Sequence, residues 1–361
     1  MKKILFSFMI VSILCSCAQP RVLDDINMSQ TIGFDIEKNN NIEGIYIIPV
    51  FELQKQGEYL VLKAKADTVS DVHAKANLKS AKPIALGQTR VLLFSEKLAK
   101  TKSMKNLTDN LYRDPVISTR VLLAIGEGQV TDILDTKISQ TNLNVGIFLN
   151  ELIIQNMKIG NVPTTNFHLF LNAALEDESH AFLPIIKKTG NDIKVSGLAL
   201  FHRNKIVDKV ATKYMFTFKT LVEEHKRGHF QFNLKDNGTS QVAIEGIKGK
   251  ATYDISKAND LPAITVNIKI KGRLKEYMDG GNLTREEFIA KIEKSMEKKL
   301  IKQANYLIND FQKKNIDPLQ LKQKVLAFNK AMSDEDFKQV YPTMNITVKA
   351  DVKIIQTGIS Q

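Results

Sequence analysis

Cysteine is almost absent from this chain of 361 residues, and its two copies, Cys15 and Cys17, both lie near the amino terminus. Beyond Cys17 the chain can therefore form no disulfide, and it offers no thiolate metal ligand or cysteine nucleophile. After Leu14 no apolar run reaches the roughly 20 residues that a membrane-spanning helix needs. The folded part must depend on ordinary hydrophobic cores, which a content of 43% hydrophobic and 25% charged residues can supply.

The sequence also lacks the motifs of common catalytic sites, because it contains no Gly-x-Ser-x-Gly, no phosphate-binding loop and no dinucleotide fingerprint. Two fragments, Ser295–Lys298 (Ser-x-x-Lys) and Lys188–Gly190 (Lys-Thr-Gly), match marks of penicillin-binding enzymes. Their order along the chain is reversed and no Ser-Asp-Asn lies between them, so we interpret the match as coincidence. The sequence predicts a protein that is not an enzyme and that has no catalytic residues and no cofactor.

Histidine is scarce, and the six histidines are scattered over the chain. His225 and His229 have the four-residue spacing of a metal site on a helix, but Gly228 lies between them and the His-Glu-x-x-His pattern is absent. We predict a surface turn at these residues in preference to a metal site, and no metal site elsewhere.

Positive charge is in excess, with 51 Lys and Arg against 39 Asp and Glu and a net charge of +12. The longest basic stretch, Lys313–Lys324, contains no arginine and no aromatic residue, so it offers no stacking platform for nucleic acid bases. The excess favours contact with an anionic membrane surface or with an acidic partner domain. The alternative is that the lysines are spread over solvated faces.

The first 17 residues carry the clearest signal in the chain. Lys2 and Lys3 precede an apolar run from Ile4 to Leu14, as in a secretory signal peptide. Cys17 directly follows the small residue Ser16, which resembles the lipobox of bacterial lipoproteins. The resemblance implies cleavage between Ser16 and Cys17 and lipidation of Cys17, and two acyl chains hold a protein stably on a membrane. The alternative is an ordinary signal peptide with a chance cysteine.

We divide the chain into a signal peptide (1–16), a lipidated tether (17–21), an N-terminal α/β region (22–190) and a C-terminal domain (191–361). Strands and helices alternate in the first region, which is typical of a mixed α/β layer domain. The expected strands are Thr31–Ile36, Ile45–Leu53, Tyr59–Leu62, Thr89–Phe94 and Ser118–Ile125. The expected helices are Ser70–Ala81, one capped by Ser95 that continues through Leu111, and Phe148–Ile154.

The second half has a different pattern, which predicts an antiparallel sheet packed on one long helix. Ile193–Phe201 and Lys205–Val210 flank a tight turn at Arg203 and Asn204. Residues 264–271 and 346–354 alternate between apolar and polar positions, as expected for strands with one wet face. Between them, helical spacing of apolar residues predicts a helix over 285–314 with a capping box at Thr284 and Glu287. The fold class is therefore α+β.

An ordered set of short segments resembles the Ger(x)C family, the C subunits of endospore germinant receptors. After Cys17 come Arg21, the acidic-apolar segment Leu23–Ile26 and the Gly-x-Asp of Gly33–Asp35. The later matches are Ser70–Ala74, Val91–Ala99, Tyr112–Asp114 with Arg120, Leu183–Pro184, Val195–Phe201 and Lys205–Val207. Two departures are Ala18–Gln19, where the family usually has Trp-Asp, and Val22, where an acidic residue is expected; the chain has no tryptophan.

The resemblance implies a non-catalytic lipoprotein subunit of a nutrient germinant receptor, needed for spore germination. It implies a lipid anchor on the extracytoplasmic face of the cell membrane, in the inner membrane of the spore. The implied partners are two integral membrane subunits, with a small-molecule germinant such as an amino acid or a sugar and with no nucleic acid. The alternative function is a substrate-binding lipoprotein of a transporter, for which two Rossmann-like lobes would be expected.

Overall fold

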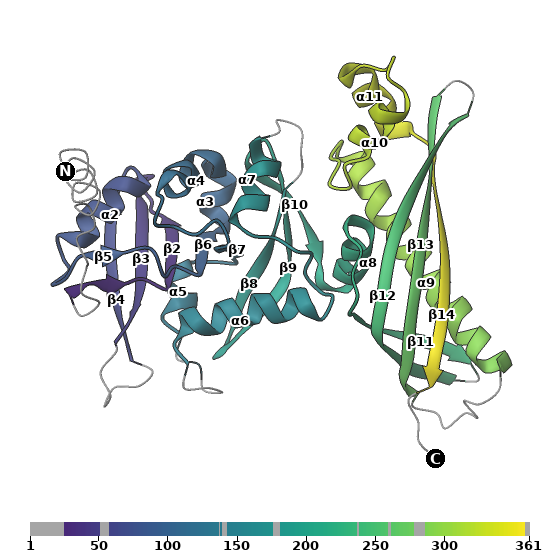
Figure 1. Cartoon of the computed structure of the whole chain (residues 1–361), viewed down its shortest axis with the longest axis horizontal. Helices are drawn as coiled ribbons and strands as arrows, with labels where there is room; N and C mark the ends of the chain where they lie inside the picture. Colours follow the sequence, from purple (N-terminus) through teal and green to yellow (C-terminus); the bar gives the residue numbers. More distant parts are fainter. Residues whose placement is uncertain are drawn as a thin grey trace, which may run out of the picture.

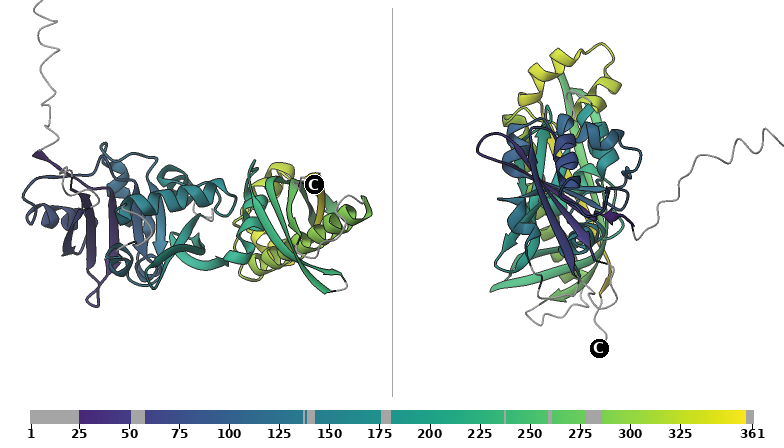
Figure 2. Two further views of the ribbon diagram at one scale, coloured as in Figure 1. Left: turned by 90° about the horizontal axis from the view of Figure 1, so that it is seen from below. Right: turned by 90° about the vertical axis from the view of Figure 1, so that its left-hand side faces the viewer.

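The computed structural model describes residues 25–50, 58–136, 138, 143–175, 181–236, 238–258, 261–277 and 286–357. Over these residues the chain forms an elongated molecule with two large sheets along its long axis (Figure 1). Helix α8 (Thr212–Val222) lies between the sheets. The first strands of the described chain lie at the end of the molecule that is farthest from the second sheet (Figure 2). Ser16, Cys17 and Thr284 lie outside the described residues.

The first sheet has eight strands. Their spatial order is β10 (Lys205–Ala211), β9 (Asp192–His202), β8 (Phe182–Thr189), β7 (Leu122–Gly126), β6 (Val91–Ser95), β2 (Thr31–Ile36), β3 (Ile42–Pro49) and β4 (Tyr59–Ala66). The four central strands β8, β7, β6 and β2 pair in parallel, and the strands on both flanks are antiparallel. A short parallel pair, β1 (Asn27–Met28) and β5 (Ile84–Ala85), lies beside this sheet.

Helices cover both faces of the first sheet, and each face has its own buried core. One face packs against α2 (Val69–Asn77), α3 (Glu96–Thr101), α4 (Met104–Arg113) and α7 (Phe167–Leu175). The other face packs against α5 (Val130–Leu134) and α6 (Val145–Lys158). Burial on both faces explains why β6 and β7 read as continuous apolar runs, since parallel strands are covered from both sides.

The elements predicted for the first half are present, with one correction. The sequence predicts a single helix from Ser95 through Leu111, whereas the structure has two, α3 and α4. Ser95 caps α3 as predicted, but Lys102 adopts an extended backbone (φ −99°, ψ 153°) that ends the helix. The Met104 N–H then donates to the carbonyl of Asn204 at 2.9 Å, so α4 begins on the β9–β10 turn. A tertiary contact that helical spacing cannot reveal divides the helix.

The division predicted between residues 190 and 191 falls at the turn of the β8–β9 hairpin. Thr189 pairs with Asp192, so the first sheet takes strands from both sides of this division. It remains a prediction about domains. The next hairpin turns at Arg203 and Asn204, as predicted, and both residues have positive φ (47° and 64°), which suits a tight two-residue turn.

The second sheet has four strands, in the order β11 (His229–Asp236), β12 (Gly238–Ala258), β13 (Leu261–Tyr277) and β14 (Ile346–Thr357). The first three strands are antiparallel, as predicted, but β14 is parallel to β13. Alternating burial shows that a strand has one wet face, but it does not show which way its neighbour runs. The direction follows from the long helical connection, which returns the chain to the end where β13 began.

Helix α9 (Glu286–Lys313) is the long helix that the sequence predicts over 285–314. It packs on the second sheet with the predicted stripe of apolar residues, of which Ile292, Met296, Leu300, Ala304, Leu307 and Phe311 are buried. Two shorter helices, α10 (Leu321–Phe328) and α11 (Asp334–Val340), and the turn η2 (Tyr341–Thr343) complete the connection to β14.

Helix α9 also covers the outer edge of β14. The Val352 N–H donates to Oε1 of Glu297 at 3.1 Å, and the Ile354 N–H donates to Oε1 of Glu293 at 2.7 Å. An edge strand offers unpaired backbone groups to other chains. Because two carboxylates of α9 occupy these donors, this part of the β14 edge is closed to strand pairing.

We expect Leu300→Ala to lower the free energy of unfolding by about 2–5 kcal/mol, because it opens a cavity in the middle of the buried stripe. The side chain of Leu300 is fully buried. Lys298→Ala, two residues away on an exposed part of α9, is the matched control and should change stability by less than about 0.5 kcal/mol. Equal denaturant midpoints for both variants would contradict the packing described for α9.

Candidate functional site: the junction between the sheets

Helix α8 joins the two sheets through side chains that are buried on all sides. Phe218 is fully buried and makes edge-on contacts with Phe182 of β8 (5.6 Å between centroids) and Phe311 of α9 (6.2 Å). Leu198, Leu200 and Val210 of the first sheet belong to the same core as the second sheet. The two halves of the molecule therefore share one hydrophobic core across α8.

Lys219, the next residue on α8, is a buried lysine whose side chain is only 2% exposed. Its Nζ donates to the carbonyls of Met157 (2.9 Å) and Val162 (2.7 Å), at the end of α6 and just beyond it. It also forms an ion pair with Oε1 of Glu223 at 2.8 Å. An ammonium group has three donors, and here each has an acceptor, which is the condition for burying such a charge.

Glu223 extends this network to the chain that leaves α6. Its carboxylate accepts from the Thr164 N–H at 2.9 Å and from the Thr164 hydroxyl at 3.3 Å. Lys219 and Glu223 therefore hold residues 157–164 of the first half against α8. The connection between the halves is polar and specific as well as hydrophobic.

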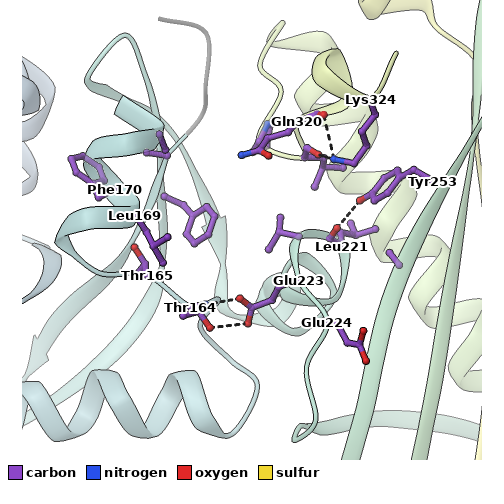
Figure 3. A pocket seen from close by; sticks show the side chains of 17 residues that line it. Thr164, Thr165, Leu169, Phe170, Leu221, Glu223, Glu224, Tyr253, Gln320 and Lys324 are labelled. Atoms are coloured by element: carbon purple, nitrogen blue, oxygen red, sulfur yellow. Dashed lines mark hydrogen bonds between the residues drawn. The ribbon is translucent and has the colours of Figure 1, made fainter. Parts of the chain in front are cut away.

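A cavity of about 470 Å³ opens beside this network (Figure 3). The first half contributes residues of α7 and the preceding loop, and the second half contributes the end of α8, strand β12 and the segment before α10. Its lining includes apolar side chains such as Leu169, Phe170 and Leu221, together with Glu223, Glu224 and Lys324. The site has the mixture of apolar walls and few charges that small-molecule pockets share.

Lys324 and Tyr253 form the wall of the cavity that belongs to the second half. The Lys324 ammonium lies 4.9 Å from the centroid of the Tyr253 ring and donates to the Leu319 carbonyl at 2.8 Å. The Tyr253 hydroxyl donates to the Leu221 carbonyl at 2.6 Å. Burial lowers the pKa of Lys324 and raises that of Tyr253.

Asp317 binds the start of α10, the helix that carries Lys324 of this wall. Its carboxylate accepts from the backbone N–H groups of Leu321 (2.8 Å) and Lys322 (2.7 Å), where α10 begins. The residue is only 8% exposed, and this burial raises its pKa from 3.8 to about 6, against the opposing effect of the two backbone donors. The start of α10 therefore depends on a carboxylate whose charge is costly at neutral pH.

The surface turn predicted at His225 and His229 is wrong for His225. His225 is buried, and its Nδ1 donates to the Arg227 carbonyl at 3.0 Å while Nε2 lies 3.0 Å from the Thr220 hydroxyl. Burial lowers its pKa. Contact with Phe216 and strand β12 encloses the ring, so a local turn pattern could not reveal its surroundings.

The two fragments of penicillin-binding motifs lie in different parts of the fold. Ser295 lies within α9 on the second sheet, and Lys188–Gly190 lies at the β8–β9 turn of the first sheet. Among the residues that the structure describes, no three His, Cys, Asp or Glu side chains gather as a metal site would require. In the same residues, no helix has the length and apolar character to cross a membrane.

Family models for spore germination proteins match both halves of the chain. The model described as the spore germination protein N-terminal domain matches residues 19–188, and the model described as the spore germination B3/GerAC-like C-terminal domain matches residues 196–358. The chain belongs to the Ger(x)C family of spore germination proteins. The resemblance inferred from short ordered segments is thereby confirmed.

Individual Ger(x)C relatives agree with this assignment. The chain is 33% identical to the spore germination protein GerQC of Bacillus cereus, over 98% of each chain. It is 22% identical to the spore germination protein KC of Bacillus subtilis (strain 168), over 97% of this chain and 94% of that one. The crystal structure of the GerBC protein has the same fold, with a TM-score of 0.59 at 15% identity, covering 90% of this chain and 96% of that chain.

In this Ger(x)C protein, neither the role of Lys219 nor the junction cavity follows from the motifs of the sequence. The available signal was one charged residue, Lys219, inside the otherwise uncharged run Met215–Val222. Asp35, the acidic residue of the Gly-x-Asp segment, also has a structural role that the motif does not reveal. It is buried, and it accepts from the N–H groups of Val130 (2.9 Å) and Thr131 (3.0 Å) at the start of α5.

We expect Lys219→Met to lower the free energy of unfolding by about 3–5 kcal/mol, because it leaves Glu223 and two carbonyls without their buried partner. Lys213→Met, in the first turn of the same helix, removes the same charge from an exposed side chain and should cost less than about 1 kcal/mol. Chemical unfolding of both variants provides the comparison. Similar small losses in the two would show that the Lys219 network does not hold the junction.

The raised pKa of Asp317 gives a second prediction. Between about pH 4 and pH 6 the folded state keeps a proton that the unfolded state has released, so stability falls as the pH rises. From pH 4 to pH 7 we expect the free energy of unfolding to decline by about 2–3 kcal/mol relative to that of Asp317→Asn. Unfolding titrations at several pH values measure this difference.

Asp336 provides a control of opposite sign. Hydrogen bonds from Ser333 lower the pKa of Asp336, so its contribution to stability is present above its unfolded pKa and is lost as the pH falls. Relative to Asp336→Asn, the parent protein should therefore gain stability as the pH rises towards the unfolded pKa of an aspartate, about 3.9, and should change little between pH 4 and pH 7. Parallel pH profiles for Asp317→Asn and the parent protein would contradict the assignment to Asp317.

Proposed function

We propose that this protein is the non-catalytic lipoprotein subunit of a nutrient germinant receptor and that it acts with two integral membrane subunits in spore germination. The observation that carries the proposal is membership of the Ger(x)C family along both halves of the chain, with full-length similarity to GerQC. The Ger(x)C assignment supports a role in spore germination. The anchor, the partners and the absence of catalysis are parts of the proposal.

The proposed anchor is a lipid on Cys17, after removal of residues 1–16 and with a short tether over 17–21. The support is the lipobox-like spacing of Leu14, Ser16 and Cys17. Two acyl chains would keep the protein on the extracytoplasmic face of the inner spore membrane. A protein held there by a short tether would reach integral membrane partners beside it.

The fold does not favour the alternative of a transporter's substrate-binding lipoprotein. That function predicts two lobes with repeated strand-helix alternation, and the first half does alternate in this way. The second half instead has a four-stranded sheet packed against one 28-residue helix. The two halves are therefore different folds and not a pair of similar lobes.

Deletion of the gene should abolish the germination response to one nutrient and leave growth and spore formation unchanged. The test belongs in a strain in which this receptor alone serves its nutrient, with a chemical trigger that bypasses receptors as the positive control. Complementation compares the parent gene with Cys17→Ala and Ser295→Ala at equal protein level. We expect Ser295→Ala to restore germination, since that residue has no catalytic role.

The Cys17→Ala protein should remain an uncut precursor that incorporates no labelled palmitate, and it should restore germination poorly. Equal palmitate labelling of Cys17→Ala and the parent would disprove the anchor. Normal germination of the deletion strain with its nutrient would disprove the receptor function. These outcomes separate the anchor from the receptor role.

A further inference from the structure

A second cavity, of about 540 Å³, lies on the side of α8 and α9 that faces the start of β11. It is lined by the first two turns of α8, by His229–Gln231 and by one face of α9. The basic groups of the cavity belong to His229 and to three lysines, Lys213, Lys299 and Lys302. The described lining contains no Asp or Glu, so the cavity concentrates positive charge.

No carboxylate of the described residues pairs with the lysines of this cavity. In the described part of the chain, Lys299 and Lys302 form no ion pair, and Lys213 lies 4.9 Å from the centroid of the Tyr214 ring. The nearby carboxylates of α9, Glu293 and Glu297, are occupied by the backbone of β14. Charges of one sign that converge on a concave surface repel one another, and an anion would relieve that repulsion.

Helical periodicity explains why the basic residues converge. Lys299, Lys302, Gln303 and Tyr306 have the i, i+3, i+4 and i+7 spacing of one helix face. This face flanks the buried stripe of α9, while Glu293 and Glu297 lie on the flank toward β14. The helix therefore places Glu293 and Glu297 at the sheet edge and Lys299 and Lys302 at the cavity.

The cavity walls are held together before any ligand binds. The buried side chain of Gln303 accepts from the Thr217 hydroxyl at 2.7 Å and donates to the Lys213 carbonyl at 3.0 Å. Tyr214 and Tyr306 stack with ring centroids 4.5 Å apart and an interplanar angle of 15°. These contacts cross-link α8 and α9, so the basic groups are positioned in advance, which reduces the entropic cost of binding.

We propose that this cavity is a binding site for a ligand that carries phosphate or carboxylate groups. Lysine ammonium groups and the amide of Gln231 provide the donors that such anions require. The chemistry is shared by the headgroup of an anionic phospholipid and by a free anionic metabolite. The site is distinct from the junction cavity, whose lining includes Glu223 and Glu224.

Isothermal titration calorimetry of the full-length protein in neutral detergent tests the proposal. The probes are tripolyphosphate, citrate, dihexanoyl phosphatidylglycerol and dihexanoyl phosphatidylcholine. The test variant is Lys299→Ala/Lys302→Ala. The matched control is Lys294→Ala/Lys298→Ala, which removes the same charge from exposed residues of the same helix that do not line the cavity.

The parent and the control should bind at least one of the three anionic probes with equal affinity, and phosphatidylcholine should not bind. The affinity of Lys299→Ala/Lys302→Ala should be lower by about tenfold or more, and binding should weaken as salt is added. Binding of phosphatidylglycerol alone identifies a lipid headgroup, and binding of tripolyphosphate or citrate alone identifies a free anion. All four lysines are exposed, so unchanged melting temperatures will show that both variants are folded.

Two results would overturn the proposal. One is equal weakening in the two double variants, which would reveal a general effect of net charge instead of a site. The other is failure of the parent protein to bind any of the three anionic probes at millimolar concentration.

Discussion

The position of one half of the molecule against the other depends on the three acceptors of the buried Lys219 ammonium. Two are carbonyls at the end of α6 and just beyond it, and the third is the carboxylate of Glu223. An ammonium without these partners could not stay buried, because the desolvation penalty of an unpaired charge is comparable to or larger than the whole free energy of unfolding of a domain. The orientation of α8 relative to the α6 end is therefore coupled to the folding of both halves.

Phe218 adds a hydrophobic requirement at the next position of the same helix. Its ring must contact Phe182 of the first sheet and Phe311 of α9 at once. Successive residues of a helix point about 100° apart, so Phe218 and Lys219 engage different neighbours and fix α8 in rotation as well as in position. The junction cavity lies beside this arrangement, and its shape is consequently determined by both halves.

Local patterns in the sequence were sufficient for most elements but not for their connections. The β13 strand and the α9 stripe follow from alternation and helical spacing, which record burial against a single neighbouring layer. The direction of β14, the division of α3 from α4 and the burial of His225 each depend on a contact distant in sequence. Lys219 is the extreme case, since its partners Met157 and Val162 are 62 and 57 residues away.

The same distinction applies to the sites. Cys17 could be proposed from a few neighbouring residues because a signal peptide is read as a linear segment. The two cavities could not, because each is assembled from elements that lie far apart along the chain.

The excess of lysine gave a signal for the basic cavity, but composition does not show whether the lysines converge on one site or are dispersed over the surface. Convergence requires α8, α9 and the start of β11 to meet, and the Gln303 hydrogen bonds and the stacked tyrosines are among the contacts that join the two helices there. The distribution of charge on this part of the protein is thus a property of its tertiary packing, which places Glu293 and Glu297 of α9 at a strand edge and Lys299 and Lys302 at a cavity.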